Sequence, residues 1–224
     1  MAETPQGVSA VASEKTTAKR SPSRRTGRGN VTCGRLRTVA APLFLARGYD
    51  RVSLDEIVRA AGGSKTNIYA FFGGKEGLFR AVIEGECREI LAPLQQLDLD
   101  GLALEAGLSR LGKTLLDLVL SPRSVALFRL VIGETGRFPQ LGAVWFAGGP
   151  ATSQRAIADF LATLMPERQA AVLARLFHDM AVQEVLHRAL FDTVATTQAR
   201  EAAVKAATLA ISALVETGRN RELV

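Results

Sequence analysis

Residues 53–72 read SLDEIVRAAGGSKTNIYAFF, a stretch that carries two helix starts separated by a pair of glycines. Ser53 followed three residues later by Glu56 is a capping box, which begins a helix. Gly62-Gly63 ends that helix, because glycine readily adopts the left-handed conformation of a helix C-terminus. Ser64 is then placed to cap a second short helix. The stretch therefore predicts two short helices joined by a tight glycine turn.

The flanking sequence adds one helix on each side of this pair. From about Cys33 onward, apolar residues recur at the spacing of one helix face, until Gly48 ends the pattern. Pro42 lies inside this helix, where it removes a hydrogen bond, so we expect a kink. After the second short helix, Gly73-Gly74 is followed by a longer helix that begins at Lys75. Its inward face is expected to consist of Leu78, Phe79, Val82, Ile83, Cys87 and Ile90.

The remainder of the chain shows helical spacing and no alternation typical of strands. Several prolines stand where a helix can start, as at Pro122, Pro139, Pro150 and Pro166. Helices are expected at about 101–120, 122–136, 139–147, 151–164, 167–191 and 197–217. The sequence therefore predicts an all-α fold.

Two short helices joined by a tight turn form a helix-turn-helix, whose second helix lies in the major groove of DNA. Its first turn contacts base edges, and in this chain that turn carries Lys65, Thr66 and Asn67. Lysine donates to guanine O6 and N7, asparagine pairs with adenine N6 and N7, and the threonine methyl meets the thymine methyl. The alternative is an ordinary pair of surface helices.

Other residues of this unit are suited to phosphate contacts. The helix starts at Ser53 and Lys75 present free N–H groups and a positive dipole end, to which Lys75 adds a full charge. The Tyr69 hydroxyl, one turn into the second helix, can also reach a phosphate. Ile68 and Phe72 are expected to point inward and hold the second helix against the first.

The charge of the chain is concentrated at its N-terminal end. The net charge is +6, of which residues 1–30 carry +4 and residues 31–90 carry +2, while residues 91–224 are neutral. Residues 1–30 are rich in Ser, Thr, Gly and basic residues and have no apolar period, so we expect a disordered basic tail. This asymmetry is typical of a chain that meets a polyanion at one end.

Over about residues 33–90 the sequence resembles the DNA-binding domain of TetR-type bacterial transcriptional regulators. Four segments match in order: AAPLFLARGYD (40–50), SLDEI (53–57), AGGSKTNIYAFF (61–72) and GKEGLF (74–79). The resemblance implies a homodimeric repressor that binds an operator palindrome and is released by a small ligand. It places base contacts at Lys65, Thr66 and Asn67, and phosphate contacts at Ser53, Ser64, Tyr69 and Lys75. Gly63 departs from the family, which usually has an apolar residue there.

The C-terminal half is similar, over shorter segments, to the AefR-like branch of these regulators: LFRLVIGE (127–134) and RFP (137–139). This similarity supports a regulator and names no ligand. We expect an apolar or amphipathic effector to bind within about residues 101–190, among Phe128, Trp145, Phe146, Phe177 and Met180. For each of these residues, ordinary core packing is the alternative.

The last two helices carry apolar stripes that are wider than one helix contact needs. In the helix at about 167–191 the stripe consists of Val172, Leu173, Leu176, Phe177, Met180, Val185, Leu186, Ala189 and Leu190. In the next helix it consists of Val204, Ala207, Thr208, Ile211, Leu214 and Val215. We expect each helix to pack both inward and against a second copy, forming an isologous four-helix bundle. The alternative is that both stripes close the core of one chain.

The expected organisation has three parts: a disordered basic tail (1–30), a three-helix DNA-binding domain (31–91), and a helical ligand-binding and dimerisation domain (92–224). The expected partners are double-stranded DNA, a small-molecule effector and a second copy of the chain. Catalysis, a cofactor, a metal site and a membrane are not expected, since the motifs for them are incomplete or absent. We expect a cytoplasmic location. The alternative function is an all-α small-molecule binding protein or enzyme that does not act on DNA.

Overall fold

The computed structural model of the protein describes residues 23–191 and 196–222. Within these residues, every element of regular secondary structure is an α-helix, which confirms the predicted all-α fold. The helices are α1 (Ser23–Arg47), α2 (Leu54–Ala61), α3 (Lys65–Phe72), α4 (Lys75–Gln95), α5 (Leu104–Val119), α6 (Pro122–Thr135), α7 (Gln140–Gly148), α8 (Pro150–Ala162), α9 (Glu167–Leu190) and α10 (Thr197–Glu222). Among them, none combines the length and apolarity needed to cross a lipid bilayer.

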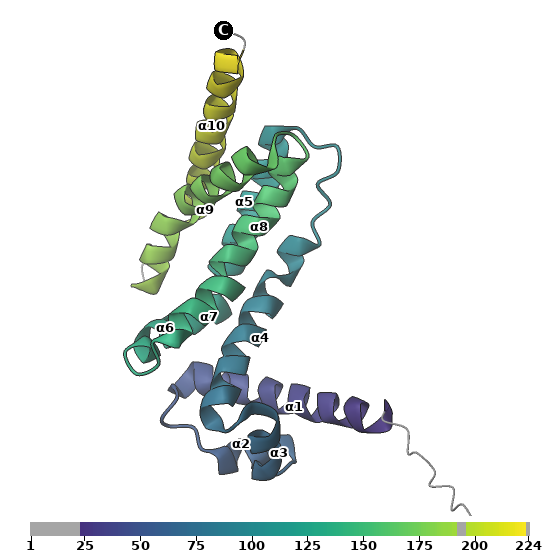
Figure 1. Cartoon of the computed structure of the whole chain (residues 1–224). Helices are drawn as coiled ribbons and strands as arrows, with labels where there is room; N and C mark the ends of the chain where they lie inside the picture. The colour runs from purple at the N-terminus through teal and green to yellow at the C-terminus, as the bar shows by residue number, and fades with distance from the viewer. Residues whose placement is uncertain (1–22, 192–195, 223–224) are drawn as a thin grey trace, which may run out of the picture.

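Helices α1 to α3 gather at one end of the molecule, around the beginning of α4 (Figure 1). Their apolar faces meet in a core that includes Phe44, Ile57, Ile68 and Phe79, none of which is exposed to solvent. This core also takes in residues of α6 and α7, among them Leu127 and Leu141. The end that carries α2 and α3 is therefore packed against the rest of the chain rather than tethered to it.

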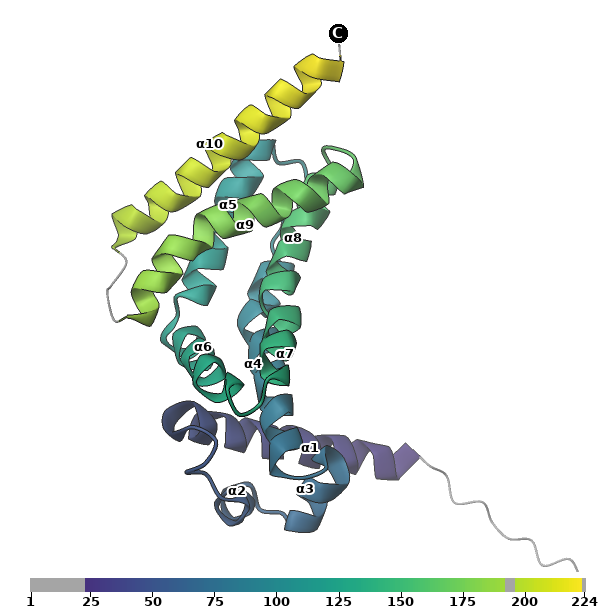
Figure 2. The same ribbon diagram turned by 60° about the vertical axis from the view of Figure 1, so that its left-hand side comes forward.

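Helix α4 runs from this end into a second bundle, formed by α5, α8, α9 and α10 (Figure 2). The core of the bundle is rich in leucine and includes Leu111, Leu115 and Phe177. Gly107 allows close packing of α8 on α5, because a Cβ atom there would lie 1.9 Å from Cζ of Phe160. Helices α9 and α10 pack side by side on the outside of the bundle.

The N-terminal boundary requires a correction. We expected a disordered tail through residue 30, but α1 begins at Ser23. Pro22 is tolerated just before a helix, and Gly27 and Gly29 lower helix propensity by about 1 kcal/mol each without ending a helix that is anchored further along. Residues 1–22 of the predicted tail lie outside the described residues.

Candidate functional site

The helix pair α2–α3 forms with the predicted capping. The Ser53 hydroxyl accepts a hydrogen bond from the N–H of Glu56 at 3.1 Å, and Ser64 accepts one from the N–H of Asn67 at 3.3 Å. Gly62 ends α2 with a φ of 63°, a left-handed conformation that residues with a Cβ rarely adopt. The sequence thus sets the start of both helices and the turn between them.

The first turn of α3 presents polar side chains to solvent. Lys65 and Thr66 are exposed and Asn67 is half-buried, while Ile68 behind them is fully buried. The Nζ atom of Lys65 lies 2.8 Å from a carboxylate oxygen of Asp55, which is also exposed. Exposed ion pairs contribute about 0–1 kcal/mol, so Lys65 can exchange Asp55 for another partner at little cost.

The side chain of Lys75 contacts Tyr49 and Asp50 in the loop that follows α1. Its Nζ atom lies 4.2 Å from the centroid of the Tyr49 ring and donates a hydrogen bond of 3.5 Å to the carbonyl oxygen of Asp50. Burial lowers the pKa of Lys75, an effect that the Asp50 carboxylate opposes. Among the described residues no side chain caps the start of α4 at Gly74, where the first N–H groups of a helix lack partners within the helix.

The remaining predicted phosphate contacts also lie on this surface. The Tyr69 side chain is 60% exposed, and Ser53 and Ser64 are exposed beside the two helix starts. The two serine hydroxyl oxygens each accept an N–H of their own helix, so their hydrogens can donate to an anion, as can that of the Tyr69 hydroxyl. The structure thus brings the predicted DNA-contacting residues to one end of the molecule, with Lys75 partly engaged elsewhere.

Contacts from α6 and the segment after it hold the loop that follows α1. The N–H of Tyr49 donates to Glu134 at 2.9 Å, and Arg137 forms an ion pair with Asp50. The ring of Tyr49 packs edge-on against Phe138, with centroids 4.7 Å apart. Helix α6 is therefore fixed to the helix-turn-helix end of the molecule at its C-terminus.

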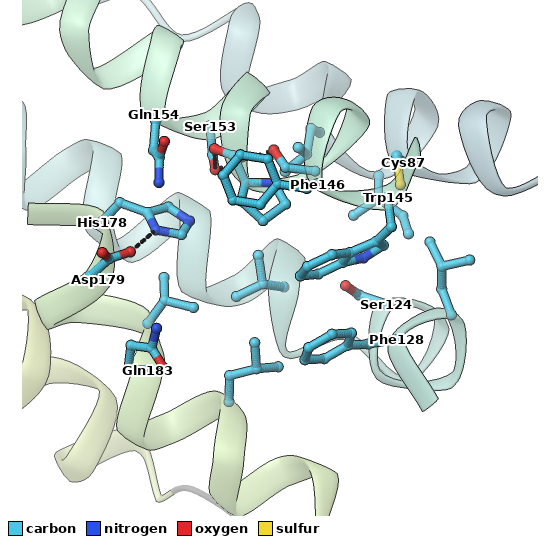
Figure 3. A pocket seen from close by; sticks show the side chains of 18 of the residues that line it. Cys87, Ser124, Phe128, Trp145, Phe146, Ser153, Gln154, His178, Asp179 and Gln183 are labelled. Carbon is cyan, nitrogen blue, oxygen red and sulfur yellow. Dashed lines mark hydrogen bonds and ion pairs between the residues drawn. The ribbon is translucent and has the colours of Figure 1, made fainter. Parts of the chain in front are cut away.

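The first half of α6 contributes Ser124, Leu127 and Phe128 to the wall of a cavity of about 540 Å³ that lies between α4, α6, α7, α8 and α9. Phe128 of α6 and Trp145 of α7 stack in parallel on one wall, with ring centroids 4.3 Å apart. Opposite them, His178 and Asp179 of α9 lie near Gln154 of α8 (Figure 3). The cavity therefore has an aromatic side and a hydrogen-bonding side.

Three of the five predicted effector-binding residues line this cavity: Phe128, Trp145 and Phe146. The other two do not, and this is a correction. Phe177 is fully buried in the bundle core, and Met180 is 45% exposed on the outside of α9. Hydrophobicity does not distinguish the three faces of a long helix, each of which can carry apolar residues.

Sequence reasoning missed the polar residues of the cavity. Arg175, Asp179, Gln183 and His187 recur every fourth residue on α9, and all four line the cavity. This spacing was visible in the sequence, but a polar stripe is more often a solvated helix face. Within residues 23–191 and 196–222 no group of three or more His, Cys, Asp or Glu side chains is placed to hold a metal ion.

Cys87 of α4 lies in the cavity wall, is 3% exposed, and should be chemically inert. Burial raises its pKa to about 11, so at pH 8 only about one thiol in a thousand is ionised. We expect iodoacetamide to alkylate the half-buried Cys33 and to leave Cys87 unmodified, as measured by peptide mass spectrometry. Both should react in urea. Equal labelling in the folded protein would contradict this assignment.

The outer faces of α9 and α10 expose apolar side chains. On α9 these are Val172, Leu176 and Met180, spaced four residues apart, and on α10 they are Leu209 and Leu214. The exposed positions of α10 also include Ala202, Ala206 and Ala213. Ile211, which we expected at an interface, is instead fully buried in the core of the chain.

Two family models match the chain. The model of bacterial regulatory proteins of the tetR family matches residues 36–82, and that of the C-terminal domain of AefR-like transcriptional repressors matches residues 106–214. The HTH-type transcriptional repressor ComR of Escherichia coli (strain K12) is 47% identical over 45 residues, which are 20% of this chain and 21% of ComR. The chain thus matches only about a fifth of the length of this curated relative.

Solved structures are similar over most of the chain. A TetR-family transcriptional regulator of Mesorhizobium loti has a TM-score of 0.74 at 24% identity, covering 84% of this chain and 98% of its own. The flavonoid-responsive regulator FrrA has a TM-score of 0.67 at 26% identity, covering 81% and 95%. A TetR transcriptional regulator of Agrobacterium tumefaciens has a TM-score of 0.60 at 23% identity, covering 84% and 94%.

Proposed function

The chain belongs to the TetR family of bacterial regulatory proteins and is a transcriptional regulator; from this premise we propose that it is a homodimeric repressor controlled by a small molecule. Helix α3 reads one half-site of a palindromic operator, α9 and α10 form the dimer, and the cavity between α4 and α9 binds the effector. The observation that carries this proposal is the doubly capped α2–α3 pair, whose exposed first turn is Lys65, Thr66 and Asn67.

The proposed base contacts follow from the chemistry of that turn. The amide of Asn67 can pair with adenine N6 and N7, and Lys65 can leave Asp55 to donate to guanine O6 and N7. Ser53, Ser64 and Tyr69 would donate to phosphates on either side of the groove.

Lys75 has a double role in this proposal. Its cation–π contact with Tyr49 and its hydrogen bond to Asp50 orient its side chain at the start of α4. The charge then adds to the electrostatic attraction of a phosphate toward the uncapped N–H groups of that helix.

A dimer about a two-fold axis would bury the exposed apolar faces of α9 and α10 and would pair two recognition helices for DNA binding. The exposed apolar faces of α9 and α10 supply surface to bury, and their alanines allow two helix pairs to approach closely. Two recognition helices must also lie about 34–36 Å apart to enter successive major grooves, which one copy of the chain cannot provide.

An effector would act through α6, which lines the cavity with Phe128 and holds Tyr49 through Glu134. A molecule that binds better when α6 is displaced would favour a form with misplaced recognition helices. The structurally similar regulator FrrA is named for its response to flavonoids, which supports control by a small molecule here.

The start of α1 at Ser23 moves one boundary of the expected organisation. We propose residues 23–91 as the DNA-binding part and 92–224 as the effector-binding and dimerisation part. The core of the first part extends to Leu127 and Leu141 of the second, so the two parts are expected to move as coupled units.

Removing the Asn67 amide tests base reading directly. We expect Asn67→Ala to weaken operator binding by ~2 kcal/mol and to relax preference at one base pair per half-site, because alanine keeps the helix but cannot pair with adenine. Binding should be measured by fluorescence anisotropy on the DNA upstream of the gene and on single base-pair variants of each half-site.

A lysine far from the proposed interface supplies a control for charge. Lys65→Ala should also alter sequence preference, whereas Lys113→Ala on α5 removes the same charge and should leave preference and affinity unchanged within about twofold. An Asn67→Ala protein with the parent's base preference would contradict the proposed reading role.

A further inference from the structure

The two sides of the cavity differ in what they can bind. Phe128 and Trp145 stack almost in parallel, with 8° between their ring planes, so each ring covers one face of the other. Because both residues line the cavity, the outer face and the edges of this pair favour an aromatic ligand, which can stack on the pair or meet it edge to face. The opposite side carries His178, Gln154 and Gln183 (Figure 3).

Of the imidazole, amide and charged side chains that line the cavity, that of His178 is the most buried. The residue is 7% exposed, and its Nδ1 atom lies 2.9 Å from a carboxylate oxygen of Asp179. Because a carboxylate only accepts, Nδ1 carries the hydrogen, and Nε2 of the neutral ring is left with a lone pair. Among the described residues no group bonds Nε2, which points toward the cavity in Figure 3.

The charges around the cavity do not favour an ionised ligand. Of the residues that line it, Arg175 and Asp179 carry full charges, and these are opposite and exposed. The inner wall carries hydroxyl and amide groups, such as those of Ser124 and Gln154. A carboxylate buried there would lack a buried cation to offset its desolvation.

From this arrangement we infer that the effector is an uncharged, planar aromatic molecule with a phenolic hydroxyl, which donates its hydrogen bond to Nε2 of His178. Asp179 is a positioning residue, since it fixes the tautomer that makes Nε2 an acceptor. The inference rests on the proposal that this cavity is the effector site. It goes further by assigning the ligand class and the direction of one hydrogen bond.

Three naphthalene probes separate the possibilities on the full-length protein. The first, 2-naphthol, can donate; 2-methoxynaphthalene has the same ring and oxygen but cannot donate; and 2-naphthoate is an anion. Calorimetry at neutral pH should give a lower Kd for 2-naphthol than for the other two. The decisive quantity is the ratio of the Kd of 2-methoxynaphthalene to that of 2-naphthol.

Substitutions of His178 and His187 show which histidine is responsible for this ratio of Kd values. His178→Phe keeps a planar ring but removes the acceptor, so the ratio should fall by about fivefold, the usual effect of losing one hydrogen bond. His178→Gln retains an acceptor oxygen, so the ratio of Kd values should fall less than in His178→Phe. This second variant keeps the inference testable if His178→Phe does not fold. The chain has one other histidine, His187, which lies at the cavity rim.

The inference is overturned if neither His178→Phe nor His178→Gln changes the ratio of Kd values, or if only His187→Phe abolishes it. Tighter binding of 2-naphthoate than of 2-naphthol would equally overturn it, as would binding of none of the three probes. Operator binding measured on the same preparation separates these failures from failure of the proposed regulator function.

Discussion

Leu214→Glu is expected to give a folded monomer that binds operator DNA about a hundredfold more weakly than the parent protein. Leu214 is 49% exposed in one chain, so a glutamate there is hydrated and the monomer keeps its core. In the proposed dimer the same carboxylate would be buried without a partner, which opposes association. A monomer loses the gain from binding two half-sites together, typically a factor of 10²–10⁴.

Light scattering and operator titration measure the two parts of this expectation. Lys113→Glu is the control, because Lys113 is exposed on α5 rather than on α9 or α10; that variant should remain dimeric. Ile211→Glu is not a test of the interface, since Ile211 is buried within one chain and its substitution should unfold the protein. A parent protein that is monomeric at micromolar concentration would exclude the dimer.

Arg123→Met is expected to lower the free energy of unfolding by about 3 kcal/mol, because it leaves the buried carboxylate of Glu86 without a cation. Glu86 of α4 has a side chain that is 4% exposed, and Arg123 of α6 binds its two oxygens at 2.5 and 2.6 Å. The hydrogen bond with Glu86 raises the pKa of Arg123, so the guanidinium keeps its charge. The urea midpoint measures the loss.

The same arginine also contacts Glu89, which provides a control. Glu89 is 44% exposed, so Glu89→Gln should cost less than about 1 kcal/mol. The double variant Arg123→Met/Glu86→Met should recover most of the stability, since no buried charge remains. Equal losses for Arg123→Met and Glu89→Gln would show that burial of Glu86 has no part in the effect.

Local rules predicted the helix-turn-helix end well. Ser53, Ser64 and Gly62 act on backbone groups within three or four residues of themselves, so their roles follow from sequence spacing alone. The start of α1 was missed because a helix with its C-terminal half anchored in a core can extend through residues that are weak helix formers.

Long-range packing explains the other differences. Phe177 and Met180 lie on the same helix as the cavity residues, but which face meets the cavity depends on the position of α8 and α5. Ile211 and Leu214 are both apolar on α10, and only the placement of α9 and α5 beside that helix buries the first and exposes the second. The contact of Lys75 with Tyr49 could not be predicted from local spacing, because it joins the start of α4 to the loop that follows α1.

The position of Trp145 gives the protein a built-in optical reporter. The chain has one tryptophan, and its indole stacks on Phe128 in the cavity wall. Protein fluorescence at wavelengths longer than tyrosine emission therefore comes from Trp145 alone. It reports on the polarity of this part of the cavity wall and on rings that stack there. Occupancy of the cavity can be followed without a label, in the same cuvette and at the same time as the anisotropy of a labelled operator.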